Sequence, residues 1–488
     1  MTASTVLQND LAKRVFRSFL WVAGARYVGQ VLSWAVTIVI ARILSPRDYG
    51  LMGMATLFYS FLIMFAEMGF GAAVIQKKDL TEGQLRSASW FLIASSLLLY
   101  LLSFLLAPLL ALFFQEPQLV ALIRVLALNF IIVAVYSVPY NLLARKLQFD
   151  RISKAEFIAN LCGSAATLAL AMNGFEFWSL VAGFFVINTV KAALVLYYQK
   201  WVPRFRLVLA EIREILGFGS KITGAHFLWY FYSNSDFLIA GRMLGKVALG
   251  AYSLAFQIAS LPLDKIDSLV NQIAFPAYAE IQSDRASMQR YFLKTIRILS
   301  FIVFPVFTGL FLVAEDLVML FLTAKWSAII FPLKALLVVS ILRTLSVLSP
   351  PVVNALNRPG ISLFNTLLCA VVMPVSFLIG VRFGINGLAA AWLIAYPLVF
   401  TVMTWNSLRV IEVTPGEYAR QIAPTALICL VMVAVVTAAQ KHLLADSAAL
   451  PRMTLTCLTG VAVFSVFSLL LNRPVMAEMI SLVRRKGA

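Results

Sequence analysis

The chain has few charged side chains and little of the chemistry that soluble enzymes use. Only 13% of its 488 residues are Asp, Glu, Lys or Arg, and it has 2 histidines, whereas about 25% charge is usual in soluble domains. The sequence contains no GxxxxGK[ST] phosphate-binding loop and no HExxH zinc motif. These absences argue against a soluble enzyme, a P-loop nucleotide hydrolase and a His-based hydrolase. We therefore expect no enzymatic activity, no metal and no cofactor.

Cysteine is also scarce. The 4 cysteines lie inside apolar runs without CxxC spacing, which is typical of small core residues and not of metal ligands. There is no disulfide framework of the kind that holds small secreted domains together.

Hydrophobic residues, in contrast, make up 61% of the chain. Fourteen membrane spans of about 20 residues would need about 280 apolar positions, which this composition supplies. The sequence predicts an all-α polytopic membrane protein with about 14 transmembrane helices. The predicted spans are 18–41, 51–75, 87–114, 118–142, 155–173, 176–199, 217–241, 247–275, 291–314, 329–350, 360–381, 385–408, 421–441 and 453–472.

The positive charge follows these spans. The net charge is +18, and with the N-terminus inside, 25 Lys and Arg fall in the inner loops and 9 in the outer ones. This bias places both termini in the cytoplasm. An anionic membrane surface accounts for most of the basic residues, so we expect membrane lipids, and no nucleic acid, as partners.

An internal repeat divides the chain. Residues 21–60 align without gaps to 221–260, and eight pairs are identical, among them Arg42 with Arg242 and Gly50 with Gly250. Six spans separate the copies, so both enter the membrane in the same direction, as in a parallel repeat. The predicted organisation is two six-helix lobes, a basic amphipathic linker that continues as a helix to 218 on the membrane surface, and two additional helices with a basic cytoplasmic tail. The lobes are residues 1–200 and 217–410, the linker is 201–216, and the additional helices and tail are 411–488.

Each lobe's first helix carries a polar stripe. Arg26, Gln30 and Ser33 lie on one side of the first helix, and His226 and Tyr230 occupy the matching positions of the second copy. If the lobes face each other, both stripes line a shared central cavity. The alternatives are that Arg26 extends to the interface or pairs with a neighbouring helix, and that His226 is a core histidine.

Other ionisable residues inside the spans are candidates because charge in hydrocarbon is costly. The candidates for substrate binding are Arg124, Lys221, Asp236, Lys265 and Arg343, and those for ion coupling are Glu67, Asp236 and Asp267. Glu67 and Asp267 are repeat mates. Packing remains the alternative for each arginine, and an ion pair for each carboxylate, for example Asp267 with Lys265 or Arg26.

The motifs ARILSPRDYGLMGMATLF (41–58) and NSDFLIAGRMLGKVALGAYSLAFQIASLPLDKI (234–266) carry a family resemblance. They resemble the polysaccharide repeat-unit flippases of the Wzx type, in the branch similar to the colanic acid exporters and often called lipopolysaccharide biosynthesis proteins. The resemblance covers about residues 15–410 and is weakest beyond that point. It implies the fold of the multidrug/oligosaccharidyl-lipid/polysaccharide exporter superfamily, in which two six-helix bundles form a V around a central cavity and flippases add two C-terminal helices.

The resemblance also implies a substrate and a place. It predicts flipping of undecaprenyl-pyrophosphate-linked oligosaccharide repeat units across the bacterial inner membrane, for exopolysaccharide or lipopolysaccharide assembly, by alternating access. A polysaccharide polymerase and a chain-length regulator are implied partners. An ion-coupled drug/cation antiporter of the same superfamily is the alternative, although the cationic spans argue against it. A membrane polymerase or ligase would need a sizeable outer loop, and none is present.

Overall fold

The structure, a computed structural model, describes residues 35–67, 80–146, 148–201, 204–282, 284–445, 447–473 and 475–476. Within these ranges the chain is helical and contains no strand. Long apolar helices satisfy every backbone group internally, as the hydrocarbon core of a membrane requires.

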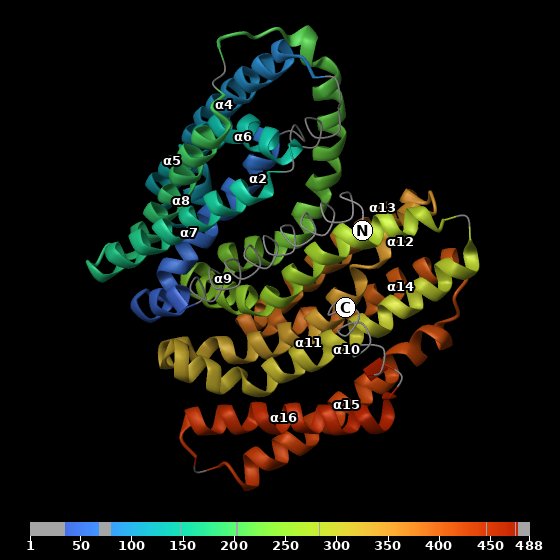
Figure 1. Ribbon diagram of the computed structural model, residues 1–488. Coiled ribbons are helices and arrows are strands. Elements are labelled where there is room, and N and C mark those ends of the chain that lie inside the picture. Colours follow the sequence, from blue (N-terminus) through green and yellow to red (C-terminus); the bar gives the residue numbers. More distant parts are fainter. Residues whose placement is uncertain are drawn as a thin grey trace, which may run out of the picture. The chain divides into compact units, whose positions relative to one another are not determined.

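The helices of the first half (Figure 1) agree closely with the predicted spans. They are α2 (Pro46–Glu67), α4 (Glu82–Phe114), α5 (Leu119–Ala127), α6 (Asn129–Arg145), α7 (Phe149–Met172) and α8 (Glu176–Gln199). The second half contains α9 (Leu209–Glu280), α10 (Arg285–Leu317), α11 (Ile330–Ser346), α12 (Ser349–Ala355), α13 (Pro359–Gly380), α14 (Gly384–Ile411), α15 (Pro415–His442) and α16 (Ala449–Leu471). A π-helical turn (Val318–Leu322) and a 3₁₀ turn (Ala324–Ile329) join α10 to α11.

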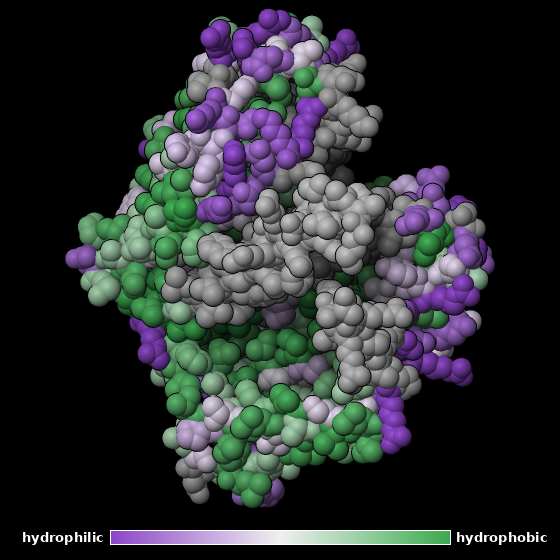
Figure 2. All heavy atoms as spheres, in the orientation of Figure 1, coloured by the Kyte–Doolittle hydropathy of each residue, from purple (hydrophilic) through white to green (hydrophobic). Residues whose placement is uncertain are grey.

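Eleven helical stretches of the described residues are long and apolar enough to cross a membrane. Pro359–Ile411 covers two predicted spans, and Trp229–Asp267 covers parts of two more. Most of the predicted first span lies outside the described residues. The eleven stretches are therefore compatible with fourteen spans, and the all-α multi-span fold is confirmed. In Figure 2 the visible surface of α15 and α16 is largely hydrophobic, as expected of helices in contact with lipid.

The chain divides into two compact units. One contains Met1–Tyr230 together with Gly245–Val247, and the other contains Phe231–Leu244 and Ala248–Ala488. The division falls inside α9, further along the chain than the predicted linker. In the second unit α15 and α16 pack on α10, where Arg452 forms an ion pair with Asp316 and Gln440 donates to the carbonyl of Leu312 at 3.2 Å.

The two copies of the repeat break at equivalent positions. Residues 35–43 are helical, and a new helix, α2, begins at Pro46, with Ser45 between them. The Ser45 backbone N–H and hydroxyl both donate to Asp48 Oδ2, at 2.8 and 2.6 Å, which caps α2. In the second copy Gly245 interrupts α9 with φ 78° and ψ −178°, a conformation that is essentially restricted to glycine. Ser45 and Gly245 are 200 residues apart, which is the offset of the repeat.

Candidate functional site

A buried polar cluster lies in the second unit. The carboxylate of Asp236, on α9, accepts a hydrogen bond from the Tyr252 hydroxyl at 2.7 Å and from Trp392 Nε1 at 3.1 Å, both at Oδ2. Its Oδ1 accepts from the backbone N–H of Phe237 at 2.9 Å. Asp236 and Tyr252 are 0% exposed and Trp392, on α14, is 2% exposed. The carboxylate is therefore dry and held by fixed donors.

A cation lies beside this carboxylate. Arg343, on α11, places its guanidinium carbon 5.0 Å from the ring centroid of Phe256 and 5.1 Å from that of Trp392. It interacts electrostatically with Asp236 and with Asp264. Nη1 of Arg343 is buried and has no hydrogen-bond partner among the described residues. The guanidinium thus keeps donor capacity while two aromatic faces stabilise its charge.

The break at Gly245 explains how Asp236 and Tyr252 meet. They are 16 residues apart on one continuous segment, and an uninterrupted helix would place them about 24 Å apart along its axis. Because the chain turns at Gly245, the two arms of α9 can face each other. Aromatic rings enclose the cluster, with Phe377 5.2 Å and Tyr396 5.6 Å from Trp392 between ring centroids.

This arrangement has a clear chemical capability. An arginine in a membrane-spanning region is costly unless it pairs or faces a polar space. A guanidinium with an unused N–H binds phosphate oxygens well. The neighbouring carboxylate can change the charge of the cluster by taking up a proton. The cluster is therefore suited to an anionic group and to coupling its binding to protonation.

The structure brings together two of the predicted site residues, Asp236 and Arg343. Lys265 and Asp267 lie further along α9, and both interact electrostatically with Asp264, which in turn interacts with Arg343. Asp264, Lys265, Asp267 and Arg343 therefore form one electrostatically interacting group in the second unit.

Two other candidates lie in the first unit and make packing contacts. Arg124 stacks on Phe104 at 3.8 Å from the ring centroid, and its Nε donates to the Phe104 carbonyl at 3.4 Å. The Tyr230 hydroxyl donates to the carbonyl of Leu57 at 2.5 Å, and its ring lies 5.8 Å from that of Phe61. For Arg124 these contacts agree with the packing alternative.

The remaining candidates stay predictions. Arg26, Gln30 and Ser33 lie outside the described residues, and so do the side chains of Glu67, Lys221 and His226, although their backbone positions on α2 and α9 are helical. Sequence reasoning did not find Tyr252 and Trp392. An aromatic residue in an apolar helix is ordinary, and only the fold shows that these two point their polar atoms at Asp236.

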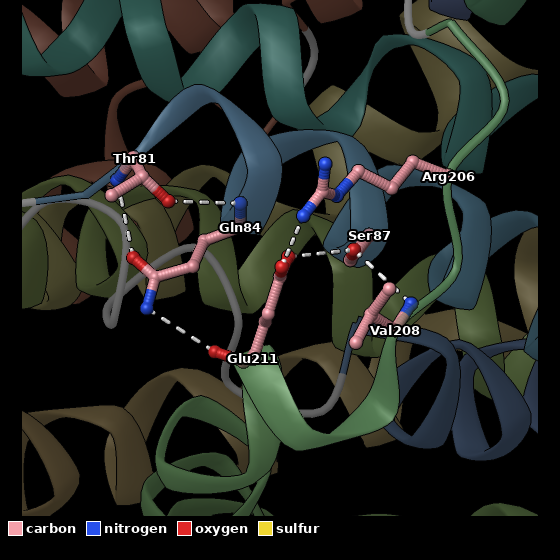
Figure 3. Close-up of polar contacts among 6 residues, drawn as sticks. All are labelled: Thr81, Gln84, Ser87, Arg206, Val208 and Glu211. Carbon is pink, nitrogen blue, oxygen red and sulfur yellow. Dashed lines mark hydrogen bonds and ion pairs between the residues drawn. The ribbon is translucent and has the colours of Figure 1, made fainter.

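The linker between the two halves docks on the start of α4, as Figure 3 shows. Ser87 accepts from the Val208 backbone N–H at 3.2 Å and donates to Glu211 Oε2 at 3.2 Å. Gln84 donates to the Glu211 carbonyl at 3.2 Å, and Arg206 pairs with the Glu211 carboxylate. Residues 204–208 are not helical, and α9 begins only at Leu209. The predicted amphipathic helix therefore starts later than its pattern suggests, because Ser87 binds the non-helical backbone ahead of it.

Loss of the Glu211 carboxylate should loosen this linker. The hydrogen bond from Arg206 lowers the pKa of the Glu211 carboxyl from its usual value of about 4.3. A carboxyl with a lowered folded pKa stabilises the docked state above its unfolded pKa, and this contribution is lost as the pH falls through the folded value. At neutral pH we expect a protease to cleave the linker of Glu211→Gln a few times faster than that of the wild type. Below about pH 4 the wild type should lose this protection, and its linker should be cleaved as fast as that of the variant.

The measurement is limited proteolysis of inverted vesicles, with trypsin at neutral pH and an acid-active protease such as pepsin in acid. Glu412→Gln, which removes an exposed carboxylate paired with Arg285 at 3.0 Å in the other unit, serves as the control and should leave linker cleavage unchanged. Equal cleavage of both variants would show that the Glu211 contacts do not hold the linker.

The chain is similar to known proteins in sequence. The family model described as "Polysaccharide biosynthesis protein" matches residues 39–331. The teichuronic acid biosynthesis protein TuaB of Bacillus subtilis is 30% identical over 347 residues, 68% of this chain and 72% of that protein. The lipopolysaccharide biosynthesis protein WzxC of Escherichia coli is 26% identical over 403 residues, 81% of each chain.

Solved structures share the fold. The lipid II flippase MurJ in an inward closed conformation superposes with a TM-score of 0.76 at 13% identity, covering 94% of this chain and all of that one. An inward-facing multidrug resistance transporter of the MATE family, in the MOP superfamily, gives a TM-score of 0.60 at 17% identity over 78% of this chain and 94% of that one. The predicted all-α fold class, similar to that of these transporters, is thereby confirmed.

Proposed function

Because this chain belongs to the polysaccharide biosynthesis protein family, we propose that it flips oligosaccharide repeat units, linked to undecaprenol by pyrophosphate, across the bacterial inner membrane. The direction is from the cytoplasmic to the outer leaflet, for exopolysaccharide or lipopolysaccharide assembly. It works by alternating access and does no covalent chemistry itself. Both termini lie in the cytoplasm, in agreement with the charge bias of the loops.

The observation that carries this proposal is the buried N–H group of Arg343, which is unpartnered in the described part of the chain. Its Nη1 has no hydrogen-bond partner among the described residues, in a helix long and apolar enough to span the membrane. A pyrophosphate-linked head group needs cationic donors where water is scarce, and a guanidinium supplies them in the geometry that phosphate oxygens prefer. The aromatic faces of Phe256 and Trp392 keep the cation in place without neutralising it.

The neighbouring carboxylate couples substrate binding to the protonation state of the cluster. When Asp236 is ionised it competes with an anionic ligand for Arg343, with which it interacts electrostatically. Protonation of Asp236 removes this competitor and strengthens the hold of Arg343 on phosphate, so proton binding and substrate binding favour each other. Glu67 and Asp267 are the other candidates for coupling.

The test is the orientation of lipid-linked intermediates in a strain lacking this gene. We expect repeat units to accumulate on the cytoplasmic face, where a membrane-impermeant periodate-type reagent labels them in inverted vesicles and not in right-side-out ones. Restoring the gene should remove the accumulation.

Accumulation on the outer face instead would indicate a polymerase step. Unchanged intermediates together with new sensitivity to cationic drugs would indicate the drug/cation antiporter. Either result would refute the flippase proposal.

A further inference from the structure

A second polar cluster lies in the first unit, where the helices α6, α7 and α8 pack against one another. Figure 1 shows these three helices. The Lys191 ammonium lies 3.3 Å from Glu156 Oε1, and the Tyr140 hydroxyl donates to the same oxygen at 3.0 Å. Lys191 also lies over two tyrosine rings, 4.8 Å from the centroid of Tyr140 and 5.6 Å from that of Tyr136. Tyr136 in turn donates to Asn188 at 3.4 Å.

The cluster faces away from lipid. At about 100° per residue, three of the four large exposed apolar residues of α7 lie about 140–160° around the helix from Glu156; they are Ile158, Leu161 and Met172, and Phe149 at the helix start is the exception. Three polar residues lie within about 80° of it; they are Ser153, Asn160 and Ser164. Because the apolar side suits contact with hydrocarbon and charge does not, Glu156 and its polar neighbours face the protein side of α7.

The ion pair is reachable and keeps unused hydrogen-bonding capacity. The side chains of Glu156 and Lys191 are 36% and 21% exposed. Both donors to Glu156 reach Oε1, and Oε2 has no hydrogen-bond or ion-pair partner among the described residues. Lys191 makes one hydrogen bond within the described chain, and an ammonium has three N–H groups. The pair can therefore bind a further polar ligand without breaking its own contact.

We infer that this cluster is a saccharide-binding site. A pair of neighbouring sugar hydroxyls can donate to Glu156 Oε2 and accept from Lys191 at the same time. The partly exposed ring of Tyr140 offers a flat apolar surface of the kind against which binding sites orient their ligands, and the buried Tyr136 supports it. The Glu156–Lys191 pair has no net charge, so it favours a hydroxyl-rich ligand over a phosphate, in contrast to the Arg343 cluster.

The position suits an entering head group, a point that rests on the proposed function. Glu156 lies seven residues after the start of α7 and Lys191 eight residues before the end of α8, so each is about 10–12 Å from the cytoplasmic ends of these helices. A sugar chain that enters from the cytoplasm reaches this depth before it could reach the outer half of the membrane.

The experiment measures binding by calorimetry with the purified full-length protein. The first probe is the oligosaccharide released by mild acid from the lipid-linked repeat units of the producing strain, and the second is inorganic pyrophosphate. We expect Glu156→Gln and Lys191→Met each to weaken oligosaccharide binding about tenfold or more, since hydrogen bonds to charged groups are lost. Pyrophosphate binding should be unchanged, and Tyr140→Phe should have a smaller effect because the ring remains.

Lys154→Met is the matched control, because Lys154 is an exposed lysine on the opposite side of the same helix, and it should bind the oligosaccharide normally. Variants that bind the oligosaccharide like the wild type would overturn the site, and so would normal binding combined with lost transport, which would indicate a coupling pair. A wild-type protein that binds neither probe would instead count against the proposed function. Equal amounts of monodisperse protein for all variants exclude misfolding as the cause.

Discussion

Replacing Asp236 with Ala is expected to destabilise the fold so strongly that the amount of folded protein in the membrane falls to a small part of the wild-type amount. The change leaves the Tyr252 hydroxyl and Trp392 Nε1 without their shared acceptor and leaves Asp264 as the remaining carboxylate that interacts with Arg343. Removing one member of a buried charged set costs about 3–5 kcal/mol, a large part of the 5–15 kcal/mol typical of a native protein. The measurement is thermal unfolding in detergent, which should begin several degrees lower.

Asp236→Asn separates structure from coupling. The amide oxygen can still accept from Tyr252 and Trp392, so this variant should fold and retain far more protein than the Ala variant. It cannot change charge with pH, and its transport should therefore lose the pH dependence that we propose for the wild type. An Ala variant as stable as the wild type would show that the cluster is not important for folding. An Asn variant with unaltered pH dependence would remove Asp236 from coupling.

Replacing Gly50 with Ala is expected to have the second largest effect, because the helix α2 touches another backbone there. A Cβ at this position would lie 1.7 Å from the carbonyl oxygen of Lys246, a contact that backbone atoms cannot relieve without moving. The segment Gly245–Val247 would have to shift, and the Lys246–Glu116 ion pair, at 2.6 Å, would be strained or lost. Overpacking of this kind typically costs about 1–3 kcal/mol or more.

The measurement is again thermal unfolding together with the amount of protein in the membrane. Gly416→Ala is the control, because no atom lies within 4 Å of the Cβ that this change would add, and it should be almost neutral. If Gly50→Ala were equally neutral, the close approach of α2 to Lys246 would not exist in the membrane.

Sequence alone predicted the helices well because their length and apolarity are set by the membrane itself. Ser45 and Gly245 illustrate this, since turn-forming residues mark the breaks between spans that the apolar runs already indicated. Helix starts were less accurate at the linker, where α9 begins at Leu209. Its amphipathic pattern is local, whereas the hydrogen bond from Val208 to Ser87 in the non-helical segment 204–208 joins residues more than 100 positions apart.

The site was only partly predictable. Asp236 and Arg343 stand out because a charge in an apolar run is unusual, so composition identifies them. Trp392 does not, since a tryptophan in such a run is common and its bond to Asp236 spans 156 positions. Glu156 and Lys191 show the same limit. Each lies within two or three turns of a predicted helix end, where a charge also occurs without any function, and only their contact across α7 and α8 shows a shared role.

One short stretch of α9 is part of the first unit although it lies in the second half of the sequence. Residues 245–247, which belong to the second copy by sequence, are part of the first unit, where the Lys246 carbonyl lies against Gly50. A first half cut at the linker would lack residues 245–247, and Gly50 would lose the backbone against which it packs.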